Sequence, residues 1–303
     1  MTHSFLRESK LYIEYGGNKY RIYTAPAITF NQTFAQDSYS VKTLHDQSKM
    51  FDGSTITKAN TANFSFDVPL TVEKDERHIV TLLSDITSGQ LTSFNIYIVT
   101  GSSTFKLEDA VITAADFDIN PERQFTVGIQ GEATKLERVG DESYNLGTIQ
   151  SESSSRTPLL VYPVISLDGS DVTNIMSTTL LIQNDITWTP YSTVQASLLV
   201  TDATNIMRPS TYTIDKRNVS GAFRQYQLDS NVTKFDDFST SSNLIVKAIK
   251  VGESASATPF FQIQLNPASY TARMETGEVY TQSYDYRSLD NTNSVSTQIT
   301  QYI

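Results

Sequence analysis

Few residues in this chain have the type and spacing that catalysis or metal binding needs. The three histidines, His3, His45 and His78, are not spaced as metal ligands on one element. The sequence also lacks an HExxH pattern and a glycine-rich phosphate-binding loop. Because the chain has no cysteine, thiolate chemistry, disulfides and cysteine-ligated zinc are excluded. The sequence therefore predicts no catalytic residue, no cofactor site and no metal site, and a protein that is not an enzyme.

Two carboxylates, Asp116 and Asp118, share one face of a predicted strand. Glycoside hydrolysis needs two carboxyl groups about 5–10 Å apart. The matching segment later in the chain, Tyr284-Asp285-Tyr286, does not keep the pair, so a solvated strand face is the preferred interpretation. The segment Asp168-Gly169-Ser170-Asp171 resembles a calcium loop but lacks its later ligands. We interpret it as a tight turn.

The elements that position these residues are predicted to be mostly strands. Bulky and polar residues alternate on both sides of Gly16-Gly17, which is typical of a hairpin. Further strands are expected at 27–30, 63–68, 94–99, 105–117 (with a break) and 124–136. The polar stretch 31–55 is too long for an ordinary connection, so we interpret it as a hairpin arm or a functional loop.

One helix is expected in each half of the chain. Thr71 can cap the first helix, and acidic residues follow in its first turns. The helix has an apolar stripe that includes Leu83, and Gly89 ends it. The spacing of Leu244, Ile245, Ala248 and Ile249 favours a second helix. Leu83 and Ile249 are expected to be buried against their own sheets.

Several strand sequences occur twice. Ile28-Thr29-Phe30 recurs as Ile186-Thr187-Trp188, a shift of 158, and 94–98 recurs as 261–265. The sequence therefore predicts two tandem antiparallel β-sandwich or barrel-like domains, 1–138 and 159–303, each with one flanking α-helix and a long loop or hairpin. A polar, flexible linker, 139–158, would let them lie side by side without sharing one core.

Charge and hydropathy exclude several classes. The net charge of −10 argues against a protein that grips nucleic acid, because phosphate binding needs a basic surface. The sequence has no apolar run of about 18 residues that could span a membrane, so no membrane insertion is expected. The N-terminus lacks the features of a signal peptide, and we expect folding in a cytoplasm.

The order of elements resembles the tail tube proteins of long-tailed bacteriophages. The features that carry the resemblance are a strand ending at Phe30, the polar stretch up to Gly53, a strand with Asn63-Phe64-Ser65-Phe66, a helix ending near Gly89, and closing strands. The closest likeness is to the siphophage type, in which two tube domains are fused in one chain and three chains close a pseudo-hexameric ring.

The resemblance implies a structural virion protein: a major tail tube subunit whose stacked homotrimeric rings conduct DNA during ejection. It would be assembled in the host bacterial cytoplasm and contact tape-measure, tail terminator and baseplate proteins, without cofactors. Its long loop would reach the neighbouring ring, so inter-ring candidates are Gln36, Asp37, His45, Lys49 and Asp52.

A tube that DNA passes without specific binding should have a net negative lumen with few unpaired Lys or Arg. Polar positions of the barrel strands are the candidates for that lining. The lumen candidates are Asp116, Asp118, Glu132 and Glu275.

Three alternatives stay open from the sequence. In the first, the chain would be a related tail initiator or baseplate ring protein. In the second, it would be a receptor- or glycan-binding β-sandwich of the virion. Tyrosines clustered around predicted hairpins keep the binding function open. A glycan-cleaving enzyme is the third, although the two halves do not share a carboxylate pair.

Overall fold

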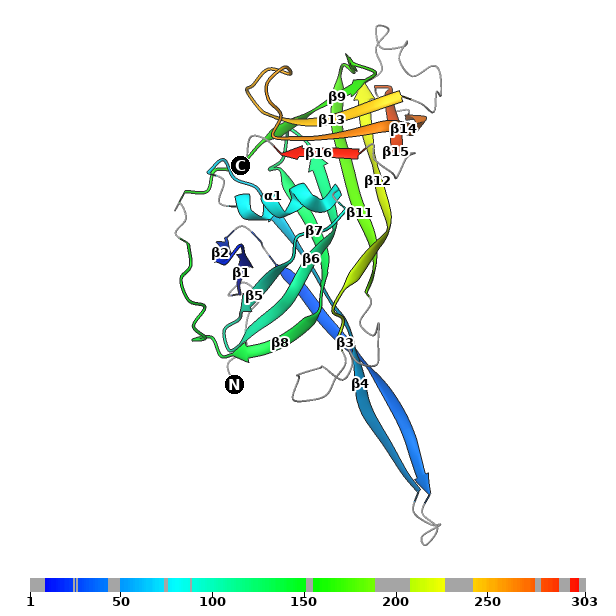
Figure 1. The fold of residues 1–303 in the computed structure, drawn as a ribbon. Helices are drawn as coiled ribbons and strands as arrows, with labels where there is room; N and C mark the ends of the chain where they lie inside the picture. Colours follow the sequence, from blue (N-terminus) through cyan, green and yellow to red (C-terminus); the bar gives the residue numbers. More distant parts are fainter. Residues whose placement is uncertain are drawn as a thin grey trace.

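The structure is a computed structural model that describes residues 9–23, 25, 27–42, 50–73, 76–87, 89–150, 155–188, 208–226, 242–275, 279–288 and 295–299. It confirms a mainly β fold, with antiparallel strands and one short helix in this part of the chain (Figure 1). No helix within these residues is long and apolar enough to cross a membrane.

The described residues of the first half form eight strands and the helix. Their bounds are β1 (Lys10–Tyr15), β2 (Asn18–Ile22), β3 (Ile28–Lys42), β4 (Met50–Pro69), α1 (Arg77–Ser84), the 3-10 turn η2 (Asp85–Thr87), β5 (Phe94–Val99), β6 (Thr104–Ile119), β7 (Thr126–Ala133) and β8 (Lys135–Gly140). The hairpin around Gly16-Gly17 and the strand 94–99 are therefore confirmed. The predicted break in 105–117 corresponds to two irregularities of β6, one between Leu107 and Ala110 and one between Ile112 and Ala114.

The part of the second half that the structure describes forms eight more strands. Their bounds are β9 (Val161–Leu167), β10 (Ser170–Asp171), β11 (Ile175–Trp188), β12 (Tyr212–Tyr226), β13 (Ser242–Lys250), β14 (Phe261–Glu275), β15 (Thr281–Ser288) and β16 (Val295–Ile299). Asp168 and Gly169 connect β9 to β10 with φ angles of 47° and 79°. The tight turn predicted there is confirmed.

Eight strands form one long central sheet in the order β3-β4-β7-β6-β11-β12-β15-β14. All of these pairings are antiparallel, and the pairing of β6 with β11 joins the two halves of the chain. The sheet is open rather than a closed barrel, because β3 pairs only with β4 among the described residues.

The pairings of β1–β8 recur in β9–β16. Each of the seven strand pairs in the first half has a counterpart of the same connectivity in the second. Gly16 of the β1–β2 turn corresponds to Asp168 of the β9–β10 turn, and 168 − 16 = 152. The shift of 158 inferred from Ile28 and Ile186 is wrong for these strands, because it would take Phe66, the partner of Ile28, to Arg224, whereas Ile186 pairs with Ile214.

The helix α1 begins six residues after Thr71, so Thr71 is not its N-cap. Glu76 occupies that position, and its buried carboxylate accepts hydrogen bonds from Thr71 N (3.2 Å) and Thr71 Oγ1 (2.9 Å). The apolar stripe is confirmed, with Leu83 1% exposed. The helix lies beside β6 and β16, so it covers core from both halves (Figure 1).

The second predicted helix is wrong, because its residues form strand β13 between β9 and β14. Leu244, Val246 and Ala248 are buried at alternate positions, which is the period of a strand. Ile249 is also buried, as expected, but on a strand. Two neighbouring strands supply backbone partners on both sides, and this tertiary pairing favours the extended conformation.

The two halves share one hydrophobic core, so the expectation of separate cores is wrong. The ring of Phe117 stacks on Phe261 at a centroid distance of 4.5 Å, and Phe125 meets Phe260 edge-on at 5.5 Å. These contacts join strand β6 and its following turn to β14, and they belong to one continuous cluster of buried residues. The domain boundaries at 138 and 159 stay a prediction.

Close packing of this core depends on Gly131 in β7. A Cβ added there would lie 2.2 Å from Phe64 Cζ and 2.3 Å from the carbonyl oxygen of Val111. We expect Gly131→Ala to lower the free energy of unfolding by roughly 1–3 kcal/mol, because β7 must move away from β6. Gly128→Ala, on the exposed face of the same strand, is the control, and denaturant unfolding of both measures the difference. Equal stabilities would contradict this packing.

The described parts of the predicted linker are hydrogen-bonded to the first half. Lys19 Nζ donates to the carbonyl oxygen of Leu146 (2.8 Å), whose side chain packs on Tyr12 and Tyr97. Further along, the Glu73 carboxylate accepts hydrogen bonds from Thr157 N (2.7 Å), Thr157 Oγ1 and Ser155 Oγ (3.0 Å). The linker therefore follows the surface of the first half.

We expect acid to release the end of this linker. The hydrogen bonds from Thr157, with a smaller one from Ser155, lower the pKa of Glu73 from 4.5 to about 2. A lowered folded pKa stabilises the fold above pH 4.5, and this stability is lost as the pH falls toward 2. The protection of the Thr157 amide from hydrogen exchange, taken relative to the intrinsic exchange rate at each pH, should fall over that window, and Glu73→Gln should lower it already at pH 6. Unchanged exchange in Glu73→Gln, as in the control Glu142→Gln, would contradict this role.

Candidate functional site

One face of the central sheet is polar and the other packs against the core. In β7, Val127 and Ile129 are buried, whereas Thr126, Gly128 and Gln130 lie on the opposite face. The same alternation continues across the neighbouring strands through the registers of β4, β6 and β11. The chain therefore presents a broad polar sheet face, which we call the polar face.

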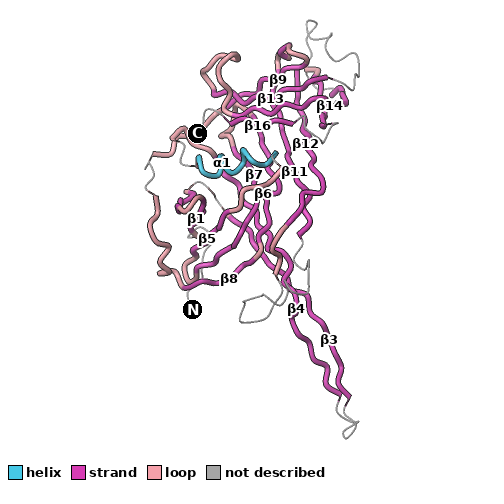
Figure 2. Tube along the Cα trace, in the orientation of Figure 1, coloured by secondary structure: helices cyan, strands magenta, loops and turns pink. Residues whose placement is uncertain are grey.

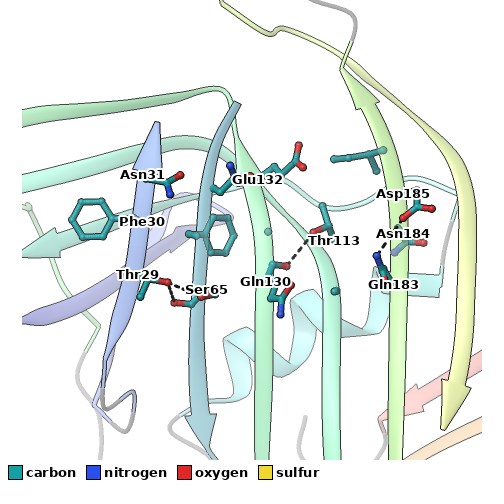
Figure 3. A pocket seen from close by; sticks show the side chains of 15 residues that line it. Thr29, Phe30, Asn31, Ser65, Thr113, Gln130, Glu132, Gln183, Asn184 and Asp185 are labelled. Atoms are coloured by element: carbon teal, nitrogen blue, oxygen red, sulfur yellow. Dashed lines mark hydrogen bonds between the residues drawn. The ribbon is translucent and has the colours of Figure 1, made fainter. Parts of the chain in front are cut away.

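The polar face is concave beside the junction of the halves (Figure 3). A hollow of about 610 Å³ lies there between strands from β3 to β11. Its lining consists mostly of hydroxyl, amide and carboxylate side chains: Thr29, Asn31, Asn63, Ser65, Thr113, Gln130, Glu132, Gln183, Asn184 and Asp185. Such a lining is hydrophilic and offers little apolar area to a bound ligand.

Side chains of this hollow bond to the neighbouring strand or to one another. Thr29 Oγ1 and Ser65 Oγ lie 2.6 Å apart, and Gln183 Nε2 donates to Asp185 Oδ1 at 3.3 Å (Figure 3). Across the part of the chain that the structure describes, no group of three or more acidic or histidine side chains is placed to hold a metal ion. The arrangement forms a hydrated surface more readily than a reaction centre.

Asp116 and Asp118 lie on the polar face and are exposed, where the sequence placed them. Asp67 of β4 belongs to the same group, since Asp67 and Asp116 flank Gly128 across three strands. Burial first, and then the charges of Asp118 and Asp67, raise the pKa of Asp116 above its ordinary value. Sequence reasoning missed Asp67. Its neighbours Phe66 and Val68 are buried in the core, so strand alternation places Asp67 on the polar face.

Glu132 lines the hollow and is half-buried. Trp188 Nε1 donates to Glu132 Oε2 at 2.6 Å, and burial raises the pKa of Glu132 although this hydrogen bond opposes the shift. The Trp188 ring packs against Tyr212 at 5.2 Å. The Tyr212 hydroxyl in turn donates to the carbonyl oxygen of Leu91 (3.0 Å). Glu132 thus helps to fix the β11–β12 hairpin to the first half.

Arg217 makes a second bridge between the halves. Its guanidinium donates to Asn184 Oδ1 (2.7 Å) and to the carbonyl oxygen of Thr87 (2.5 Å), at the end of η2. Asn184 Nδ2 donates to the carbonyl oxygen of Ile86 (2.8 Å). Burial lowers the pKa of Arg217. These bonds set the orientation of β11 and β12 relative to the helical segment.

The second half of the polar face carries basic side chains. The basic side chains on β12, β14 and β15 are exposed. Among them, Arg273 forms an ion pair with Asp285 (2.8 Å). The backbone of Glu275 ends β14 opposite Thr281, and its side chain lies outside the described residues. The polar face is therefore divided into two regions. Carboxylates gather on β4, β6, β7 and β11, and the basic residues on β12, β14 and β15 are Lys216, Arg224, Arg273 and Arg287.

The stretch 31–55 is a hairpin arm, one of the two forms that the sequence predicted. Strands β3 and β4 stay paired as far as Lys42 and Met50, and the arm projects from the body of the molecule (Figures 1 and 2). The candidates Gln36, Asp37 and Asp52 lie on its strands. His45 and Lys49 lie outside the described residues. The long loop expected in the second half spans 189–212, and its residues 189–207 lie outside them as well.

Comparison with known proteins identifies a family for the chain. No curated protein matches the chain. A model of the Bacteriophage Baseplate Tube Protein Family matches residues 1–303, the whole sequence. The chain belongs to the bacteriophage baseplate tube protein family and is a structural component of the phage tail.

Proposed function

We propose that three copies of this chain close a ring of the tail tube and that the polar face lines its lumen. The observation that carries this proposal is the central sheet, whose eight strands run uninterrupted through both halves of the chain. The apolar face of the sheet packs on the core of the chain. The opposite, polar face is therefore left to contact either solvent or a passing polymer. A tube wall needs this division of faces.

Three chains per ring is the expected number. The recurring strand pairings support two equivalent halves per chain, so three chains supply six units around one axis. Such a ring has true threefold and approximate sixfold symmetry, and each chain meets the next head to tail. The family description favours a ring at the baseplate end of the tail over the repeated subunit of the whole tube.

The polar face suits a conduit better than a binding or reaction site. Carboxylates on the face repel the phosphates of DNA, which carries a charge per about 1.7 Å of duplex. We propose that DNA passes without specific binding, that the lumen is net negative, and that the chain has no enzymatic activity. Its partners in this function are further copies of itself together with tape-measure, tail terminator and other baseplate proteins.

The hairpin arm suits contact between rings. A two-stranded hairpin is marginally stable alone in water. Residues of β4 that precede Ala62 pair with β3 but no longer with β7, so the arm is such a hairpin. We propose that the arm packs on the adjacent ring or on a neighbouring baseplate protein, which supplies the missing contacts.

Mass measurement of assembled rings tests the stoichiometry. The 33.8 kDa chain should give native particles of three chains, and multiples of three where rings stack. Particles of six chains per ring, or a protein that remains monomeric under conditions that assemble tails, would refute the proposal.

A further inference from the structure

The polar face carries opposite charges in the two halves of the chain. In the recurring strand pairings, β12, β15 and β14 occupy the places of β4, β7 and β6. Carboxylates gather on the polar face of the first-half strands, whereas the second-half strands carry basic side chains there. We call the polar face of β12, β15 and β14 the basic sector, and its cations are Lys216, Arg224, Arg273 and Arg287. The repeat keeps its pairings but reverses its charge, so the two halves present different surfaces to a passing polymer.

The strand registers fix how far apart the arginines of the basic sector lie. Arg224 of β12 and Arg273 of β14 both lie directly opposite Ser283 of the strand between them. Because neighbouring strands are about 4.8 Å apart, the backbones of these two arginines are separated by about 10 Å. Arg287 lies opposite Ser220, which precedes Arg224 on β12 by about 14 Å along the strand. Three guanidinium groups therefore share one patch of the sheet.

The basic side chains are exposed and lie beside hydroxyl groups. Asp285 is an acidic residue of the same surface, and it forms an ion pair with Arg273 (2.8 Å). Among the described residues, Arg287 has no ion-pair partner. Ser269 and Thr271 lie on the same face of β14, opposite Arg287 and Asp285. Arginine, serine and threonine side chains are groups that bind phosphate oxygens in complexes with DNA.

The form of the basic sector favours a DNA duplex as its ligand over an acidic polypeptide. Two hollows of the polar face are lined by residues on or next to β3, β4, β6, β7 and β11, and not by the basic sector. A duplex needs no pocket, because it carries one charge per about 1.7 Å and so presents several phosphates to the patch in any register. A polypeptide would instead have to align its acidic side chains with the arginines.

We propose that the basic sector binds the phosphate backbone of DNA in the lumen, weakly and without reading its sequence. This inference rests on the proposed function, which puts the polar face in the path of DNA. In a ring of three chains, three basic sectors alternate with three acidic ones. A phosphate is attracted by one sector and repelled by the next, so the surface has threefold rather than sixfold electrostatic symmetry.

The salt dependence of DNA binding tests the basic sector. A short duplex is titrated with the purified protein at several NaCl concentrations and followed by fluorescence anisotropy. Each phosphate contact makes the logarithm of the association constant fall by about 0.9 per tenfold rise in salt. Arg224→Ser and Arg287→Ser should therefore each make this slope shallower by about 0.9, and the double variant by about 1.8. Arg287→Lys keeps the charge and should retain the native slope.

Lys10→Ser is the matched control, because Lys10 is an exposed cation on β1, outside the central sheet. It should leave the slope unchanged. Native mass measurement of the same samples separates this inference from the proposed ring. If both arginine variants bind DNA as Lys10→Ser does in rings of three chains, the basic sector does not bind phosphate and the proposed ring stands. Rings of another stoichiometry would overturn the proposed function instead, while the slopes still decide whether the basic sector binds DNA.

An acidic polypeptide is the competing occupant of the basic sector. Poly-L-glutamate of the same total charge as the duplex, titrated into the complex with DNA, separates the two. We expect it to displace DNA poorly. Tighter binding of poly-L-glutamate than of DNA, lost in Arg224→Ser and Arg287→Ser, would assign the basic sector to a polypeptide and overturn its assignment to DNA.

Discussion

Phage whose tube protein carries Asp116→Lys should assemble normal tails but deliver their DNA slowly. Asp116 is exposed on the polar face, and three chains would place three new lysines around one ring. Each attracts a phosphate by about 1 kcal/mol in water, so three together slow passage by roughly 100-fold. Plaque yield, together with DNA release triggered in vitro, measures the effect.

Two matched variants separate lumen charge from other effects. Asp116→Asn removes the same carboxylate without adding a cation and should release DNA at the native rate. Glu142→Lys makes the same charge change in an exposed turn away from the central sheet and should also be neutral. If Asp116→Lys delivers DNA as fast as Glu142→Lys, the polar face does not line the path of DNA.

Shortening the hairpin arm should abolish stacking while leaving the subunit folded. Ser38 and Ser54 lie opposite each other on β3 and β4, so replacing residues 39–53 by Asn-Gly closes a shorter hairpin with a tight turn. We expect rings that still contain three chains but no longer form longer tubes or join the tail. Electron microscopy and sedimentation of the assembled protein measure both properties.

The unfolding transition of this arm variant is its internal control. A melting temperature close to that of the native chain shows that the arm lies outside the core, whereas an unfolded variant would show that the segment is core instead. Normal tube length in a folded variant would contradict the role in stacking.

Local patterns predicted the elements whose neighbours lie close in sequence. The hairpin at Gly16-Gly17 follows from turn chemistry, and β5 follows from its run of apolar residues. Asp116 and Asp118 were placed on an exposed face because alternation along one strand decides it. Whether that face lines a lumen stays a prediction.

Features that depend on distant partners could not be predicted in this way. Leu244 and Ile249 fit a helical stripe as well as a strand, and only pairing with β9 and β14 decides for the strand. Short repeated triplets suggested a wrong shift, because several strands share the same alternation and strand pairing alone fixes the register. The hydrogen bond from Trp188 to Glu132 joins residues 56 positions apart, and no sequence pattern predicts it.

A cryo-electron microscopy reconstruction of the assembled ring, computed without imposed symmetry, tests the central claim most directly. We expect a threefold axis with three chains, and a closed sheet whose polar face, including Asp67, Asp116 and Asp118, surrounds an open lumen. A ring of six chains, or one in which this face points outward and α1 faces the axis, would contradict it.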